Sequence, residues 1–401
     1  MMKQIRAIRA LTIMRGAVAA IVLAIALTGC STAPERQLSR EPVAPYATLP
    51  NGNDPLNPSE LVSPAIAEGM IPHYEDLRGH ALNVLELSGG GQYGAFGAGF
   101  LKGWRQTGTR PEFDVVTGVS TGALLATHAF LGTPADDAVL EEIFTNVSAR
   151  DIYTKKSFLG LLFGGSSYYD TTPLKGLLDK YITEETLARV AAAHDRHRRL
   201  LIGTTNLDYQ QTWVWNMGLI AKRGDAEALE LYKKVLRASA APPIAFPPIE
   251  IEGYLFADGG VRQNIVVVGL AGKDPPQSSR HGSGTVFVIH NGQSESKPTA
   301  LRNDALHIAG PTLDTMMTNS MHGLLLRSYY AAKARKYRFR LVAIPDDVDV
   351  GDNALAFDPK QMQDAFDVGY ALGQRPDPWQ RQPVSLGDIP EWALEPALHR
   401  D

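Results

Sequence analysis

The chain of 401 residues has only one cysteine, Cys30, so an internal disulfide is impossible. Positive charge is not in excess either: 39 Lys and Arg stand against 43 Asp and Glu, and no basic block occurs beyond the N-terminus. This balance argues against a nucleic-acid-binding protein. The sequence also lacks an H-E-x-x-H motif, paired cysteines and clustered carboxylates, so it predicts no metal site and no metal cofactor.

The apolar run near the N-terminus, residues 17–27 (AVAAIVLAIAL), is too short to span a membrane comfortably. Basic residues precede it and small residues follow, which is the order of a secretory signal peptide. The LTGC sequence at 27–30 resembles the lipobox of bacterial lipoproteins. This resemblance implies that residues 1–29 are removed, that Cys30 is acylated (palmitate) and anchors the chain in a membrane, and that Ser31 favours the outer membrane. An ordinary cleaved signal with an incidental cysteine is the alternative.

Residues 30–78 are rich in Pro, Ser, Ala and Asn without periodicity, and we expect a flexible tether. The globular domain is expected over residues 79–345, with no internal repeat and no second domain boundary. It opens with a strand at 82–87, a glycine loop, a helix and a second strand at 113–117, an order that predicts an α/β protein with a parallel sheet. Residues 346–401 form a C-terminal extension with one helix, which we expect to pack on the domain.

The stretch GVSTG at 118–122 follows the second strand and precedes a helical pattern. A G-x-S-x-G motif between a strand and a helix is typical of a nucleophile elbow, in which small neighbours allow a tight turn. The helix N-terminus then lies near any negative charge that develops beside Ser120. A serine that simply caps the helix is the alternative.

The glycine loop, Gly89-Gly90-Gly91 and onward to Gly94, allows two interpretations. The spacing matches the dinucleotide-binding fingerprint, with Asp114 at about the offset of its acidic residue. Alternatively, the backbone N–H groups of the loop form an oxyanion hole. We prefer the second interpretation, because it uses both loops at the carboxyl edge of one sheet and the first leaves G-x-S-x-G unexplained.

Ser120 needs a base, because a free hydroxyl is a poor nucleophile near neutral pH. Asp258, in the sequence FADGGV, is the leading candidate, although a D-G pair is most often an ordinary turn. His290 follows a strand and would complete the chain order Ser, Asp, His of a catalytic triad. The histidines of the charged run at 194–199 are expected on a solvated face.

Together the glycine loop, G-x-S-x-G and the later D-G-G resemble the patatin-like phospholipases over about residues 81–344. The sequence ASAAPPIAFPP at 238–248 also resembles the family's segment before its aspartate strand. The resemblance implies a three-layer α/β/α fold with a mainly parallel central sheet. It further implies a dyad of Ser120 and Asp258 without histidine, and an oxyanion hole from Gly89, Gly90 and Gly91.

This chain departs from the family pattern at two positions of the glycine loop. Tyr93 stands where the family usually has Arg or Lys, and Ser88 stands where Asp is common. The missing cation weakens any expected affinity for a phospholipid head group there, whereas catalysis by backbone amides should survive.

The sequence therefore predicts a membrane-anchored, serine-dependent lipid acyl hydrolase of the phospholipase A, lysophospholipase or esterase type. Three alternatives stay open: a Ser-His-Asp esterase using His290, a non-catalytic surface lipoprotein that only binds on the same scaffold, and a nucleotide-binding protein. The apolar segment 158–165 (FLGLLFGG) is expected to be a buried loop or helix, with a cover for a lipid cleft as the alternative.

Overall fold

The computed structural model describes residues 47–48, 78–156, 167–268, 283–294, 305–351 and 353–383. In the helix that spans residues 305–334, side chains are described only from residue 320. The proposed signal peptide, Cys30, most of the tether, the segment 158–165 and the end of the C-terminal extension lie outside the described residues. Within the described part, no helix is both long and apolar enough to cross a membrane.

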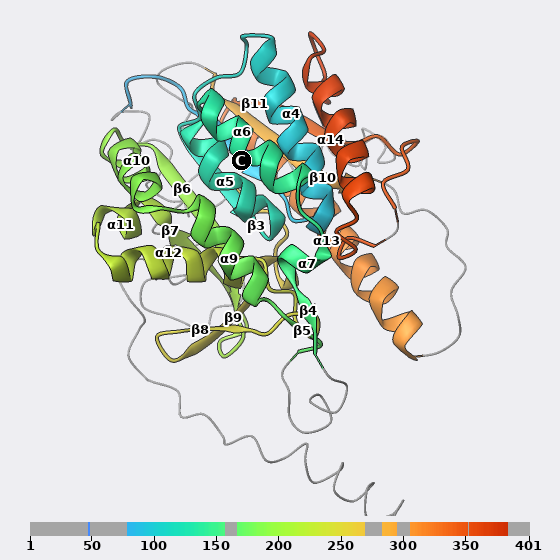
Figure 1. The fold of residues 1–401 in the computed structure, drawn as a ribbon. Coiled ribbons are helices and arrows are strands. Elements are labelled where there is room, and N and C mark those ends of the chain that lie inside the picture. Colours follow the sequence, from blue (N-terminus) through green and yellow to red (C-terminus); the bar gives the residue numbers. More distant parts are fainter. Residues whose placement is uncertain are drawn as a thin grey trace, which may run out of the picture.

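A central sheet of mainly parallel strands organises the chain (Figure 1). Its parallel part, in spatial order, consists of β6 (Arg199–Asn206), β3 (Val115–Val119), β2 (Asn83–Leu87), β10 (Thr285–Gln293) and β11 (Arg338–Ile344). Antiparallel strands extend the sheet beyond β6, and these are β7 (Gln211–Asn216) and β1 (Ala47–Thr48). The mainly parallel α/β sheet predicted from the sequence is confirmed.

Alternate side chains of the parallel strands enter two separate cores, which is why these strands are apolar on both faces. Leu85 and Leu87 of β2 lie in one core, and Val84 lies in the other with Leu324 and Leu325. The helices of the first face are α4 (Gly94–Gln106), α5 (Thr121–Leu131), α6 (Pro134–Thr145), α7 (Ala149–Ile152), α9 (Thr172–Tyr181), α10 (Glu184–Asp195), α11 (Met217–Lys222), α12 (Ala226–Ser239) and α14 (Pro359–Gly373). On the second face lies α13 (Ala305–Ala334). Two helix layers thus enclose the sheet, and the predicted three-layer α/β/α fold is confirmed.

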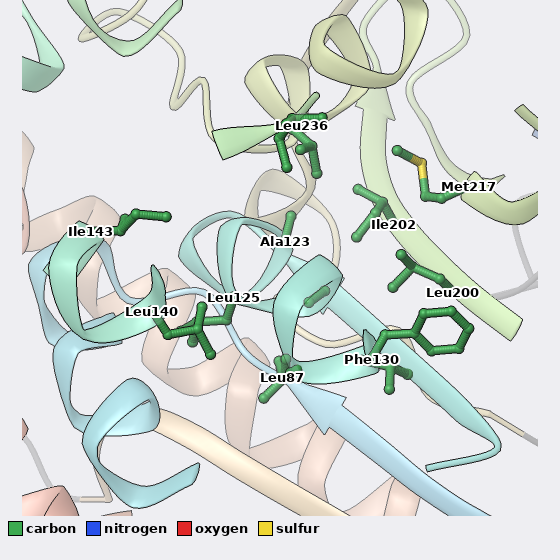
Figure 2. Close-up of a cluster of buried hydrophobic side chains, with 14 of the residues drawn as sticks. Leu87, Ala123, Leu125, Phe130, Leu140, Ile143, Leu200, Ile202, Met217 and Leu236 are labelled. Atoms are coloured by element: carbon green, nitrogen blue, oxygen red, sulfur yellow. The ribbon is translucent and has the colours of Figure 1, made fainter. Parts of the chain in front are cut away.

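The core under α5 shows how the first face packs (Figure 2). Leu125 and Phe130 of α5 belong to one buried cluster with Leu87 of β2 and with Leu200 and Ile202 of β6. All five side chains are fully buried or nearly so. Burying a large apolar side chain contributes about 1.5–3 kcal/mol, so this cluster holds α5 firmly against β2 and β6.

Helices α4 and α14 lie side by side at very short range (Figure 1). A Cβ atom added at Gly99 would come within 2.0 Å of the Phe366 carbonyl oxygen, and one at Gly369 within 2.1 Å of the Phe96 carbonyl oxygen. Only glycine allows the two backbones to approach in this way. The contact holds the C-terminal helix against the helix that follows the glycine loop.

A short antiparallel hairpin brings the later motif to the sheet. It consists of β8 (Ile249–Ile251) and β9 (Tyr254–Asp258). Strand β3 pairs with β6 up to Gly203, and β9 pairs with β6 from the next residue, Thr204, in the opposite direction. The carboxyl ends of β3 and β9 therefore meet at one point of β6.

The expectation of a solvated face at 194–199 was wrong for several of its residues. The side chains of His194, Arg198 and Arg199 are buried. The Arg198 guanidinium donates to the carbonyl oxygens of Phe113 and Phe130, so part of its hydrogen-bonding capacity is met inside the protein. Burial lowers the pKa of His194 to about 4, which keeps this histidine neutral.

Candidate active site

Ser120 occupies the tight turn between β3 and α5. Its backbone has φ 55° and ψ −125°, an unusual conformation for a residue other than glycine. A Cβ at Gly118 would lie 2.4 Å from the Gly122 carbonyl oxygen, and one at Gly122 would lie 2.4 Å from the Leu87 carbonyl oxygen. The two glycines of the motif are therefore required by space, as a nucleophile elbow demands. The Ser120 side chain makes no capping hydrogen bond to α5, which removes the simple helix-cap interpretation.

The strained turn is supported by Ser239, a role that the sequence alone did not indicate. The Ser120 N–H donates to the Ser239 hydroxyl at 3.0 Å, and that hydroxyl donates to the Gly203 carbonyl at 2.6 Å. Ser239 is fully buried at the end of α12, in the segment that resembled the family's approach to the aspartate strand. Its position there was visible in the sequence, but its contact with the turn was not.

Asp258 ends β9 beside Ser120. The Asp258 carboxyl group is only 3% exposed, it accepts the Gly260 N–H at 2.7 Å, and it is hydrogen-bonded to the Ser120 side chain. A Cβ at Gly259 would lie 2.7 Å from the Gly203 carbonyl oxygen, so the glycine after the aspartate lets the turn close onto β6. Burial raises the pKa of Asp258 to about 7, against the lowering effect of the Ser120 and Gly260 hydrogen bonds. A carboxylate with this pKa can accept a proton near neutral pH.

The glycine loop is held close to Ser120 by two buried asparagines. The Asn291 side chain donates to the Ser88 carbonyl at 2.8 Å, and the Asn264 carbonyl accepts the Gly89 N–H at 3.1 Å. The expectation for Gly89 is therefore corrected, because its N–H is already bound and Gly89 does not line the cavity beside Ser120. Gly90 and Gly91 do line that cavity.

Gly90 and Gly91 have backbone conformations that favour glycine, with φ 158° and 56°. No hydrogen bond from either N–H to another backbone group is found within the described residues. Thr121, the first residue of α5, also lines the cavity, and the first N–H groups of a helix have no partner inside the helix. These three positions are the candidate donors to a developing oxyanion.

An apolar cavity of about 240 Å³ opens beside Ser120 and Asp258. Helices α5, α6 and α9, with the loop after α6, form one wall, with Leu124, Ile143, Phe144, Val147, Leu174 and Leu177. A second wall consists of Pro242, Pro243, Ala245 and Phe246. No lysine, arginine or histidine occurs among the described residues that line it, so the cavity suits an uncharged, apolar group.

A third wall comes from the C-terminal extension, with Ala354, Leu355, Phe357 and Met362. Three side chains of the domain hold it by its backbone carbonyls. The Tyr93 hydroxyl donates to the Gly351 carbonyl at 2.6 Å, Gln92 to that of Asn353 at 3.1 Å, and Tyr153 to that of Leu355 at 2.7 Å. Tyr93, which departs from the family pattern of the glycine loop, thus helps to fix this wall, a role that the sequence alone did not indicate.

Two residues considered in the alternative interpretations lie away from the cavity. His290 does not line it and is buried beside His322 on the α13 side, where burial lowers its pKa to about 4. Asp114 lies at the start of β3, at the opposite edge of the sheet, and its carboxylate binds the Arg78 side chain and the Asn83 N–H. The geometry therefore favours neither the triad through His290 nor the dinucleotide site.

Comparisons with known proteins found similarity to one family and to two individual proteins. A family model described as patatin-like phospholipase matches residues 85–270 of this chain. Uncharacterized protein R571 of Acanthamoeba polyphaga mimivirus is 26% identical over 289 residues, which is 71% of this chain and 90% of that protein. The crystal structure of VipD from Legionella pneumophila matches with a TM-score of 0.38 and 13% identity, over 73% of this chain and 66% of that chain.

Proposed function

We propose that this protein is a serine-dependent lipid acyl hydrolase that works with a dyad of Ser120 and Asp258. The observation that carries the proposal is the hydrogen bond between the Ser120 side chain and a buried carboxyl of pKa about 7, at a nucleophile elbow that opens into an apolar cavity. The match to the patatin-like phospholipase family supports a lipid substrate.

The proposed reaction has two steps. In the first, the Ser120 oxygen attacks the ester carbonyl while Asp258 takes the hydroxyl proton and passes it to the departing alcohol. The N–H groups of Gly90 and Gly91, with that of Thr121, stabilise the oxyanion. In the second step Asp258 takes a proton from water, the resulting hydroxide attacks the acyl group, and the proton returns to Ser120 as the fatty acid leaves.

The test is hydrolysis of a panel of phospholipids, lysophospholipids and simple esters by the wild type and by Ser120→Ala. We expect Ser120→Ala to lower the rate by about 1,000-fold or more with the fold intact, because removal of a nucleophile leaves only binding and the oxyanion hole. Near-wild-type activity in Ser120→Ala would exclude this serine. The active lipid in the panel also assigns the type of hydrolase.

His290→Ala is the matched control, and it should keep most of the activity. A loss of thousands-fold in this variant would instead favour a Ser-His-Asp esterase. Labelling with a fluorophosphonate separates an enzyme from a surface lipoprotein that only binds, because only an activated Ser120 reacts.

We further propose that Cys30 carries palmitate and anchors the chain in the bacterial envelope, with the outer membrane as the expected site. The LTGC sequence at 27–30 and the preceding apolar run support this assignment. Metabolic labelling with a palmitate analogue should mark the wild type and not Cys30→Ser. Equal labelling of both proteins would contradict the anchor.

A further inference from the structure

A small exposed ridge borders the cavity. Its strands are β4 (Thr154–Lys155) and β5 (Tyr169–Asp170), and residues 242–246 lie alongside β5. The Lys156 N–H donates to the Tyr168 carbonyl at 3.0 Å, and the Tyr168 N–H donates to the Ile244 carbonyl at 2.9 Å. In Figure 1 this ridge lies at the lower edge of the molecule, below α7 and α9. Three separate segments are thus joined by backbone hydrogen bonds at one place.

Two large hydrophobic side chains of this ridge face solvent. Ile244 is 70% exposed, the highest value among the large hydrophobic residues of the described chain that are exposed, and Tyr168 is 41% exposed. Single exposed hydrophobic residues are common on proteins. Two of them joined by a hydrogen bond at the rim of a deep apolar cavity form a more specific feature.

The backbone of Ile244 is strained as well as exposed. It has φ 73°, in the left-handed region, which costs about 1–3 kcal/mol for a residue other than glycine and is least suited to a β-branched one. Little packing offsets this cost, because most of the Ile244 side chain is exposed to solvent. The strain is imposed by the surrounding turn, in which the Phe246 N–H donates to the Pro242 carbonyl at 2.9 Å.

The residues on both sides of Ile244 line the proposed active-site cavity. Pro243 and Ala245 are partly exposed and belong to its wall, so the cavity reaches the surface beside Ile244. Phe246 continues inward and contacts Tyr153 and Tyr169, with ring centroids 5.6 Å and 6.1 Å apart. The apolar surface is therefore continuous from Ile244 to the cavity interior.

Positive charge accompanies the two hydrophobic side chains. Lys155 and Lys156 are both exposed on the same ridge, and Lys156 also donates to the Ser167 hydroxyl at 3.0 Å. The nearby acid, Asp170, is directed to the Thr172 N–H at 2.7 Å. An aliphatic tip, a tyrosine and lysines are the residue types that proteins place at a membrane surface, where apolar groups enter the lipid and lysines meet phosphate groups.

We propose that Lys155, Lys156, Tyr168 and Ile244, called here the rim patch, dock the protein on the surface of a lipid bilayer that contains anionic lipids. Ile244 enters the lipid layer, Tyr168 lies at its boundary and the two lysines contact lipid phosphates. The cavity opening beside Ile244 then faces the acyl chains, so a lipid can pass from the bilayer to Ser120 with little contact with water. The docking itself needs no chemistry at Ser120.

The first experiment uses the single cysteine of the chain. The full-length protein with Cys30→Ser, Ser120→Ala and Ile244→Cys has one thiol, which is labelled with a dye whose emission depends on polarity. Adding vesicles of phosphatidylcholine with phosphatidylglycerol should shift the emission to the blue, because position 244 enters the lipid. The matched control carries the dye through Glu227→Cys on α12, whose side chain is 87% exposed, and should show no shift.

A shift at both positions, or none at position 244, would overturn the proposal. Because Ser120 is absent from these proteins, the result does not depend on hydrolysis. A failure of the rim patch can therefore be told apart from a failure of the proposed function.

The second experiment measures how Ile244 affects the stability of the fold and the rate of hydrolysis on vesicles. Ile244→Asn places a residue that tolerates the left-handed region at this position, so the variant should fold at least as stably as the wild type. Its hydrolysis of lipids in anionic vesicles should fall about tenfold, the loss expected when one aliphatic side chain no longer enters lipid, with hydrolysis of a dissolved short-chain ester unchanged. Equal rates on vesicles for wild type and Ile244→Asn would overturn the proposal.

Leu219→Asn is the matched control, because Leu219 is also an exposed hydrophobic residue, at 39%, but lies on α11, far from the ridge in Figure 1. It should leave both rates unchanged. Lys155→Glu with Lys156→Glu should lower the rate on anionic vesicles more than on vesicles of phosphatidylcholine alone. The same loss on both kinds of vesicle would overturn the role given to the lysines.

Discussion

In the described part of the chain, Ser120 and Ser328 each lie beside a buried carboxyl group, and comparing the two pairs shows what an active site needs. Asp258 is hydrogen-bonded to Ser120 and accepts the Gly260 N–H. On the other face of the sheet, under α13, the Glu86 carboxyl accepts the Ser328 hydroxyl at 2.7 Å and the Val268 N–H at 3.0 Å. Each pair thus combines one serine, one buried carboxyl and one backbone donor.

Burial raises the pKa of both carboxyls to about 7, so their electrostatics are alike. The surroundings differ. Ser120 lies at a strained turn beside Gly90 and Gly91 and opens into a cavity, whereas Ser328 is buried inside a helix and lines none of the described cavities. A perturbed carboxyl beside a serine is therefore not sufficient for catalysis. Access for a substrate and donors for its oxyanion distinguish the first pair from the second.

The largest expected effect separates the two carboxyls by activity. Asp258→Asn removes the proposed base and keeps an oxygen for the Gly260 N–H, so kcat should fall by about 10²–10⁴-fold, the usual contribution of a general base. Glu86→Gln should change kcat by less than threefold or so, because the Glu86 pair has no access to substrate. The measurement is the turnover of a dissolved ester by both variants and the wild type.

The pH profile of kcat/KM sharpens this test. With a base of pKa about 7, the wild-type rate should rise tenfold per pH unit below pH 7 and level off above it. Glu86→Gln should keep the same inflection. A profile that moves in Glu86→Gln, or a wild-type profile flat from pH 5 to 8, would contradict the assignment of Asp258 as the base.

The pH dependence of stability should be similar for the two pairs, because the pKa of both carboxyl groups is raised. The pKa of Glu86 is about 7 in the folded protein, above the ordinary value of 4.5. Between these two pH values the folded protein keeps the Glu86 proton, whereas the unfolded chain releases it. The free energy of unfolding should therefore fall by about 3 kcal/mol from this group as pH rises from 4.5 to 7. Glutamine cannot ionise, and Glu86→Gln should lose correspondingly less stability over this range.

Urea midpoints of the wild type and Glu86→Gln at pH 5 and pH 8 measure this effect. Asp258→Asn should change the pH dependence in the same direction, because the pKa of Asp258 is also raised, from 3.8. An unchanged pH dependence in Glu86→Gln would mean that Glu86 is already ionised in the folded protein.

The smallest expected effect comes from replacing one tyrosine on each face of the sheet, Tyr93 beside the cavity and Tyr337 on the α13 side. Tyr93→Phe removes the hydrogen bond to the Gly351 carbonyl and loosens the third wall of the cavity, so kcat/KM for a long-chain ester should fall by about 2- to 10-fold. Tyr337→Phe removes the oxygen that accepts the Leu82 N–H on the α13 side. It should lower stability by a similar amount of free energy and leave kcat/KM unchanged. Equal kcat/KM in Tyr93→Phe and the wild type would show that this wall needs no tyrosine.

Much of the fold follows from local patterns in the sequence. The strands β2 and β3 were expected within a few residues of their observed bounds, because buried parallel strands are short apolar runs with clear breaks. The nucleophile elbow was also predictable, since Gly118 and Gly122 are required by contacts within a few residues of Ser120 or with the neighbouring strand β2.

Other features depend on partners distant in sequence. The charged run at 194–199 suggested a solvated face, but Arg198 instead donates to the backbone carbonyls of Phe113, which precedes β3, and of Phe130 in α5. The sequence indicated the same oxyanion-hole role for Gly89 as for Gly90 and Gly91. In the structure the carbonyl of Asn264, far along the chain, accepts the Gly89 N–H. Nothing near Tyr93 indicated that its hydroxyl would hold residue Gly351.

The sequence alone therefore determined the strands, the helices and the turn that presents Ser120, because neighbouring residues set those conformations. The tertiary structure decided which groups meet. Asp258 reaches Ser120 because β9 pairs with β6 at the residue after β3 stops, and strand pairing between segments so far apart has no local signature. The cavity has its third wall because α4 and α14 approach through facing glycines, a contact that neither helix reveals by itself.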